Sequence, residues 1–225
     1  MRFYETASME QLHDLIKEVK FLPFFKNNIE GFSIEECTPP YLWFSDELPG
    51  PWEWKGPLIR TGDVVYGKFF NNKAGYISLD AFPEFANYRR NGYDFDAFYD
   101  DGFAPLKDKK LYDIISENGA IMTKKLKEIG NYRKGGNKGF DSIITKLQMQ
   151  THVCIADFQK ARTKDGREYG WGIASYAAPE YLYGENLMEE AYRHEPAESR
   201  EIVIDCLHKL MPDVRQNLLL RLISL

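Results

Sequence analysis

The sequence predicts an α+β fold, because stretches of helical periodicity alternate with short apolar runs that end in turn signals. The clearest pattern lies in the second half, where three helical stretches precede two strand-like runs. The first half, 1–104, is rich in aromatic residues and less regular. Of the 225 residues, 44% are hydrophobic and 28% are charged, which is typical of a globular protein that buries a core without disulfides.

The first expected element is a helix that begins after Ser8. Ser8 and Gln11 form a capping box, in which the Ser8 hydroxyl accepts from the Gln11 N–H and the Gln11 side chain reaches back. Apolar residues then recur at helical spacing. They are Leu12, Leu15, Ile16 and Val19. We therefore expect a helix to about Lys20, ended by the segment that contains Pro23.

Prolines, glycines and aromatic residues dominate residues 31–62, so we expect an ordered but irregular segment there, including the tryptophan-rich loop 51–57. Two strands follow, Val64 to Phe70 and Ala74 to Leu79. The sequence Asn71-Asn72-Lys73 joins them and predicts a hairpin.

A short helix is expected to run through Pro83 to about Arg90, with Ser78 or Asp80 as its cap. The acidic stretch 93–102 then predicts a loop and a boundary between the two halves. Its aspartates lack the order of a calcium-binding loop, so we expect no metal site.

Three helices are predicted next, each with its own apolar stripe. Asn118-Gly119 ends the first and Gly130 ends the second, as small residues that adopt positive φ commonly do. A basic, glycine-containing turn leads to the third. The stripes are Leu111, Ile114 and Ile115; Met122, Leu126 and Ile129; and Phe140, Ile143, Ile144 and Leu147.

Two strands complete this half, His152 to Phe158 and Glu168 to Tyr176, with Asp165-Gly166 as a hairpin signal between them. Helix, helix, helix, strand, turn, strand is the order of a winged helix-turn-helix domain. We therefore predict that domain over 105–184. One interpretation of the aromatic-rich half is a second, degenerate winged helix.

The last region, 185–225, predicts a helical hairpin. An amphipathic helix from about Ile202 breaks at Pro212, and Asp213 is expected to cap the final helix. We expect its leucine-rich face either to form a homodimer contact or to cover the core.

Basic residues concentrate around the third helix of the predicted winged domain. Residues 123–146 contain seven basic and two acidic side chains, a local charge of +5 in a chain of net charge −5. If the apolar stripe faces the core, the side chains opposite it are suited to phosphates and base edges. The predicted contacts with double-stranded DNA are Lys124, Lys125, Arg133, Lys134, Lys138, Ser142, Thr145 and Lys146. The alternative is a solvated face or a protein-binding winged helix.

Gln148 and Gln150 lie where the third helix meets the first strand of the hairpin. If they belong to the strand, their amides stand side by side and can position a water molecule or bind a base edge. The alternative is two polar residues on a solvated strand face.

Several segments resemble bacterial proteins grouped as AlkZ-related, over roughly Phe21 to Gly184. The segments are Pro51 to Pro57, Gly67 to Phe70, Lys73 to Ser78, Phe82 to Arg90, Leu147 to Gln150 and Tyr169 to Ala174. The resemblance implies tandem winged helices and a DNA glycosylase that excises alkylated bases without flipping them from the stack. It also implies a catalytic Q-x-Q motif, which Gln148 and Gln150 match.

Two functions follow as hypotheses. The first is a DNA-binding protein that excises alkylated bases, with Gln148 and Gln150 as its catalytic residues. The second is a non-catalytic winged-helix interaction or regulatory protein. No phosphate-binding glycine motif or metal-ligand spacing occurs, so no cofactor is expected. The first five residues and the absence of a long apolar run predict neither signal peptide nor membrane span, and three unpaired cysteines favour the cytoplasm.

Overall fold

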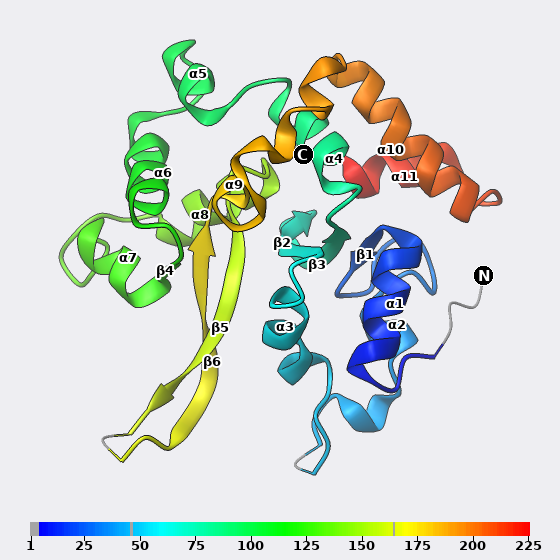
Figure 1. The fold of residues 1–225 in the computed structure, drawn as a ribbon, viewed down its shortest axis with the longest axis horizontal. Helices are drawn as coiled ribbons and strands as arrows, with labels where there is room; N and C mark the ends of the chain where they lie inside the picture. Colours follow the sequence, from blue (N-terminus) through cyan, green and yellow to red (C-terminus); the bar gives the residue numbers. More distant parts are fainter. Residues whose placement is uncertain (1–4, 46, 164) are drawn as a thin grey trace.

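One antiparallel sheet of six strands runs through both halves of the chain, in the order β1-β3-β2-β5-β6-β4 (Figure 1). The computed structural model describes residues 5–45, 47–163 and 165–225; Met1 to Tyr4, at the start of the chain, and Lys164, in the predicted hairpin turn, lie outside the described residues. The strands are β1 (Phe21–Pro23), β2 (Val64–Phe70), β3 (Lys73–Ser78), β4 (Ile121–Met122), β5 (Cys154–Arg162) and β6 (Glu168–Ala177).

Helices cover the sheet and extend from its ends. The helices of the first half are α1 (Met9–Val19), α2 (Ile34–Cys37), η1 (Pro40–Leu42), α3 (Pro51–Ile59), α4 (Phe82–Arg90) and α5 (Phe95–Asp100). Those of the second half are α6 (Leu106–Asn118), α7 (Thr123–Ile129), α8 (Phe140–Met149), α9 (Pro179–Tyr183), η2 (Glu185–Met188), η3 (Ala191–Arg193), α10 (Pro196–Leu210) and α11 (Gln216–Ile223). None of these described helices is long and apolar enough to span a bilayer.

The two halves repeat one order of elements. The first runs α1, β1, α2, α3, β2, β3, and the second runs α6, β4, α7, α8, β5, β6. In each, the short early strand pairs with the last strand of the hairpin, β1 with β3 and β4 with β6. The two hairpins meet where Tyr66 of β2 pairs with Ile155 of β5. The sheet is therefore built from two equivalent units placed edge to edge.

The structure confirms the predicted first helix and the predicted β2–β3 hairpin, together with the cap and the turn that were expected to produce them. The Ser8 hydroxyl accepts from the Gln11 N–H, and the Gln11 side chain accepts from the Ala7 N–H. The β2–β3 turn consists of Asn71 and Asn72 alone, both at positive φ (50° and 63°). Asparagine tolerates that conformation better than most residues, and it matches the strand twist in a two-residue hairpin.

Two predicted loops are helical instead. In the irregular segment predicted over 31–62, Pro51 begins α3, where its missing N–H costs nothing, and the Glu53 carboxylate accepts from the Gly50 N–H. In the acidic stretch 93–102, the Asp94 side chain accepts from the Ala97 N–H and so caps α5.

Three predicted helix starts are also corrected. Ala81 precedes α4 without a side-chain cap, so neither Ser78 nor Asp80 has that role. Arg215, not Asp213, precedes α11. The helix expected from about Ile202 begins earlier, at Pro196, because Glu198 accepts from the Glu195 N–H and closes its first turn.

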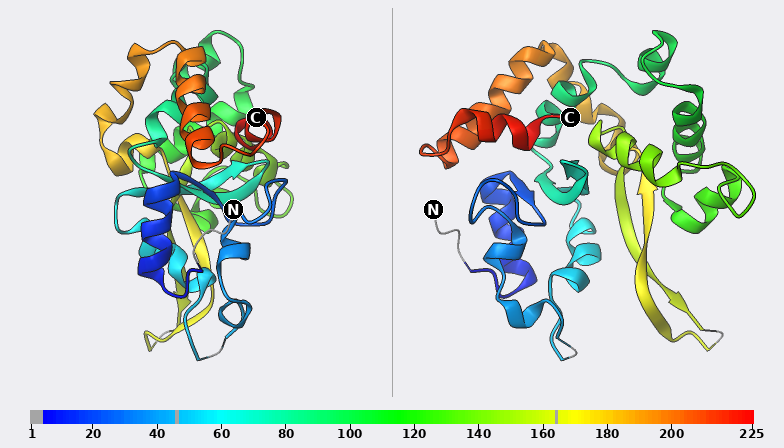
Figure 2. Two further views of the ribbon diagram at one scale, coloured as in Figure 1. Left: turned by 90° about the vertical axis from the view of Figure 1, so that its right-hand side faces the viewer. Right: turned by 180° about the vertical axis from the view of Figure 1, so that it is seen from behind.

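The buried side chains form two clusters. The larger one gathers the first half, the start of β5 and the C-terminal helices, and the smaller one gathers α5, α6, α7 and α8. Buried residues of α10 and α11, including Leu207, Leu219 and Leu222, pack into the larger cluster. Figure 2 shows these two helices against the first half of the chain. Their apolar faces therefore cover the core, and a homodimer through them stays a prediction.

Two consecutive arginines of α4 hold the end of α8 in place. Arg89 donates to the carbonyl oxygens of Met149 (2.8 Å) and Phe69 (2.8 Å), and Arg90 donates to the carbonyl oxygen (2.8 Å) and the hydroxyl (3.3 Å) of Thr151. Both arginines are 3% exposed. The last carbonyls of a helix lack partners within it, so these guanidinium groups satisfy acceptors that would otherwise be unpaired.

Replacing Arg90 should destabilise the whole fold. Arg90 also pairs with Glu180, so Arg90→Met leaves buried acceptors and a partly buried carboxylate unpaired. We expect the free energy of unfolding, measured by urea denaturation, to fall by about 3 kcal/mol. The matched control is Arg193→Ala, whose exposed ion pair with Glu189 should change stability by less than about 0.5 kcal/mol. Equal effects of the two substitutions would contradict the proposed role of Arg90.

Candidate nucleic-acid interface

Helix α8 divides into a buried face and an outward face, as its periodicity predicts. Phe140, Ile143, Ile144 and Leu147 are all buried in the smaller core cluster. Ser142 and Lys146 are exposed and Thr145 is half-buried on the other side. The helix therefore presents a short polar stripe outward, anchored by its apolar stripe.

The basic residues that precede α8 lie at the surface. Glu128 is a shared partner of Arg133 (3.1 Å) and Lys125 (4.0 Å). In the described part of the chain, no ion pair or hydrogen bond involves three other exposed lysines, whose ammonium groups are free for a ligand. They are Lys124, Lys134 and Lys138.

Two more of the predicted contact residues, Lys146 and Thr145, also have partners within the protein. Lys146 Nζ lies 2.9 Å from Asp108 Oδ2, a carboxylate that is 2% exposed. Thr145 Oγ1 accepts from Lys68 Nζ at 3.0 Å. Because removing Lys146 would leave a buried carboxylate unpaired, its substitution tests folding as much as binding.

A groove of about 730 Å³ runs beside the outward face of α8. It joins this helix to the β2–β3 turn, where Asn72 lies against Met149, 77 residues away in the sequence. The side chains that line it include Lys68, Asn71, Asn72, Asp141, Ser142, Thr145 and Gln150. Sequence inspection missed Lys68, Asn71 and Asn72 as site residues; the one available signal was that Lys68 is the single charged residue of an otherwise uncharged strand.

Gln148 and Gln150 do not lie side by side on a strand. Gln148 belongs to the last turn of α8 and Gln150 follows as its C-cap, so their side chains project in different directions. Gln148 is 1% exposed; its oxygen accepts from the Lys68 N–H (3.1 Å) and its nitrogen donates to the Ile144 carbonyl (3.0 Å). Both ends of the Gln148 amide are therefore used inside the protein.

Gln150 has a different environment. Its side chain lines the groove, and within the described residues its amide oxygen has no hydrogen-bond partner. A buried carbonyl oxygen without a partner is costly, so this atom is suited to accept from a bound ligand or an ordered water. Of the two glutamines in the Q-x-Q sequence, Gln150 is the one whose amide oxygen has no partner among the described residues.

The residue after Gln150 adopts a conformation that favours glycine. Thr151 has a φ of 64°, which is rare for a β-branched residue. The two hydrogen bonds from Arg90 to Thr151 hold it in place. The backbone directly after Gln150, which lines the groove, is thus held by α4, which belongs to the other half of the chain.

His152 follows within a ring of aromatic side chains. It is 2% exposed and its ring lies 5.0 Å from that of Phe95 and 6.3 Å from that of Tyr112. Its Nε2 has no hydrogen-bond partner in the described residues. Burial, with a further contribution from the charge of Arg90, lowers the pKa of His152 well below its usual value of 6.5.

Exposed basic residues that cluster near one helix are typical of proteins that contact nucleic acids. The AlkZ-related family model matches residues 6–224, and the chain belongs to that family. This membership suggests a DNA-repair-like protein. No curated protein and no solved structure matches the chain.

The burial of His152 should make the fold sensitive to mild acid. Its pKa is lower in the folded than in the unfolded chain, so the unfolded chain takes up the proton first. Stability contributed by the neutral ring is present above about pH 6.5 and is lost as the pH falls below it, by at most about 1.4 kcal/mol per pH unit. Urea denaturation at about pH 7 and about pH 5 should show this loss in the natural chain and a smaller one in His152→Phe.

Exposed His208 provides the control, because His208→Gln should leave the pH dependence unchanged. If the stability of His152→Phe falls by as much between these pH values as that of the natural chain, another group causes the fall.

Proposed function

We propose that the protein binds double-stranded DNA through tandem winged-helix units, with α8 as the helix that enters the major groove. The element order and the pairing of β4 with β6 support a winged helix over α6 to β6. The equivalent order from α1 to β3 supports a second, divergent unit. Family membership supports a DNA-related role.

The observation that carries this proposal is the outward face of α8 with its unpaired basic neighbours. Ser142 and Thr145 are of the types that bind phosphates and base edges, and Lys124, Lys134 and Lys138 have no internal partner among the described residues. The negative charge of the remainder of the chain would confine DNA to this region.

Duplex binding should depend on salt and on this cluster. With about four phosphate contacts, the logarithm of the binding constant should fall with log salt at a slope of about −3 to −4. The variant Lys124/Arg133/Lys134/Lys138→Ala should bind at least tenfold more weakly and show a flatter slope. Fluorescence anisotropy of a labelled duplex at two salt concentrations measures both quantities.

The matched control removes four exposed charges from elsewhere, as Lys26/Arg193/Lys209/Arg215→Ala. It has the same net charge as the first variant and should bind like the natural chain. Equal weakening in the two variants would show that overall charge, and not the α8 cluster, governs binding. No binding at low salt would instead favour a winged helix that contacts proteins.

Base excision is the second candidate function, and the unpaired amide oxygen of Gln150 favours it. In this mechanism Gln150 accepts a hydrogen bond from the attacking water and directs it toward the sugar carbon as the base departs. Gln148 acts as a positioning residue, because its amide ties the end of α8 to the backbone of Lys68. In this mechanism the two glutamines of the motif have different roles, since Gln150 contacts the water and Gln148 positions the end of α8.

Excision should distinguish the two glutamines. Incubation with alkylated duplex DNA should release bases and leave abasic sites, and Gln150→Ala should lower the rate at least 100-fold with stability unchanged within about 1 kcal/mol. Gln148→Ala should lower stability by about 2 kcal/mol, because it leaves a buried N–H unpaired. Full excision activity in Gln150→Ala would contradict a catalytic role for this residue. No excision by the natural chain would leave a non-catalytic DNA-binding protein.

A further inference from the structure

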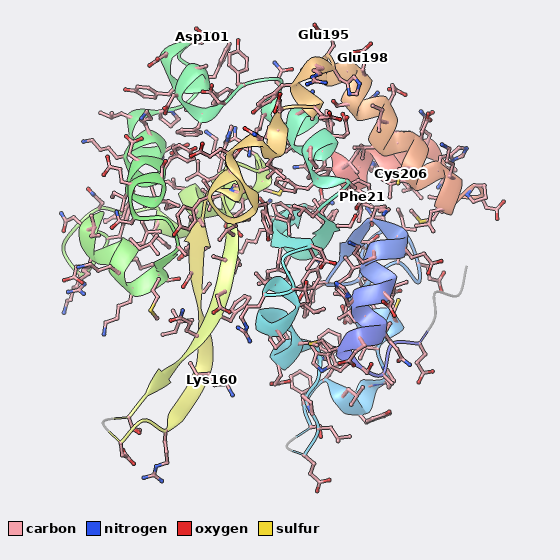
Figure 3. The ribbon with its side chains drawn as sticks, viewed as in Figure 1. Phe21, Asp101, Lys160, Glu195, Glu198 and Cys206 are labelled. Atoms are coloured by element: carbon pink, nitrogen blue, oxygen red, sulfur yellow. The ribbon has the colours of Figure 1, made fainter. Side chains whose placement is uncertain are left out.

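A second cavity is separate from the groove beside α8. It is a cleft of about 1,360 Å³ between helix α3 and the β5–β6 hairpin. Figure 1 shows the hairpin extending as a long arm beside α3, and Figure 3 labels Lys160 on that arm. Side chains that line the cleft include Phe44, Trp52, Lys55, Arg60, Phe158 and Lys160.

Lys55 has an unusual environment in this cleft. Its Nζ lies 4.6 Å from the ring centre of Trp52 on its own helix and 4.4 Å from that of Phe158 on the opposite wall. The side chain is half-buried, and within the described residues it makes no ion pair or hydrogen bond. An amine held between two rings and open to a cleft is available to a ligand.

The surroundings also make this amine more reactive than an ordinary lysine. The charged groups that line the cleft with it are Glu53 on α3, Arg60 directly after α3, and Asp157 and Lys160 on β5. Asp157 is paired with Arg60 at 2.6 Å. Burial lowers the pKa of Lys55 to about 8, although the charge of Glu53 opposes this. Near pH 8 about half of the amine is therefore neutral and nucleophilic, against less than about 1% for an ordinary lysine.

We propose that Lys55 forms an imine with an aldehyde that enters this cleft, and that the ring-opened deoxyribose of an abasic site in DNA supplies it. The neutral amine adds to the aldehyde carbon, the carbonyl oxygen takes up a proton, and loss of water leaves the carbon–nitrogen double bond. Amine and aldehyde thus give imine and water, with no oxidant or reductant. The choice of DNA as the aldehyde source rests on the proposed function.

The position of the cleft supports this source. Met122 lines it and lies two residues before Lys124, so the cleft borders the basic cluster of the proposed DNA interface. Lys160 on the arm is a cation suited to a flanking phosphate. An abasic nucleotide presents a sugar without a base, which is small enough for a cleft whose walls already hold two aromatic rings.

Reductive trapping tests the proposal. The full chain is incubated with sodium cyanoborohydride and a duplex that contains one abasic site, and the covalent adduct is measured on a denaturing gel and mapped by mass spectrometry. We expect one adduct, on Lys55, with a yield that rises at least fivefold between about pH 6 and about pH 8 as the amine loses its proton. Lys55→Arg keeps the charge and should lower the yield at least tenfold.

Lys209→Arg is the matched control, because it changes an exposed lysine on α10 that does not line the cleft, and it should leave the adduct intact. Thermal unfolding of Lys55→Arg checks that the fold is retained, and Lys55→Met provides a second test if it is not. Adducts spread over exposed lysines, or an undiminished adduct in both Lys55 variants, would overturn the proposal.

Two further measurements distinguish this proposal from the proposal of DNA binding at α8. Glyceraldehyde 3-phosphate serves as a small aldehyde, and if it labels Lys55 while the abasic duplex does not, the DNA source is wrong. Anisotropy with an intact duplex reports on the α8 cluster alone. Normal duplex binding without trapping would overturn the role of Lys55 and leave the DNA interface standing.

Discussion

The arrangement of the molecule depends on two buried guanidinium groups that cross from one half of the chain to the other. Arg89 and Arg90 end α4, yet they donate to the carbonyl oxygens of Met149 and Thr151 at the end of α8. Without them, these acceptors would be buried and unpaired, which costs more than most hydrogen bonds contribute. This arginine clamp, formed by Arg89 and Arg90, holds the end of α8 against α4 and holds Thr151 at its positive φ.

The periodic elements could be predicted from the sequence, whereas the contacts between them could not. The capping box at Ser8 and the apolar stripe of α8 are local patterns, and both are confirmed. The helix at Pro51 was missed because proline and glycine suggest a loop, although proline is favoured at a first helical position. The pairing of Gln148 with the backbone of Lys68 joins residues 80 positions apart, and no local pattern indicates it.

The groove beside α8 and the cleft beside α3 lie at equivalent helices of the two repeated units. Helix α8 carries the polar stripe and Gln150, while its counterpart α3 carries Lys55 above a cleft. In the second unit the helix is anchored by Gln148 and the arginine clamp, and in the first by the packing of Trp54 and Leu58. Under the two proposals, one unit carries the DNA-binding surface and the other carries the reactive amine.

Hydrogen–deuterium exchange of the full chain, with and without a short duplex, tests DNA binding at α8, because it locates the contact without any substitution. If DNA binds there, exchange over residues 123–150 slows in the presence of DNA, while α10 and α11 are unchanged. Protection confined to α10 and α11, with none over residues 123–150, would contradict it.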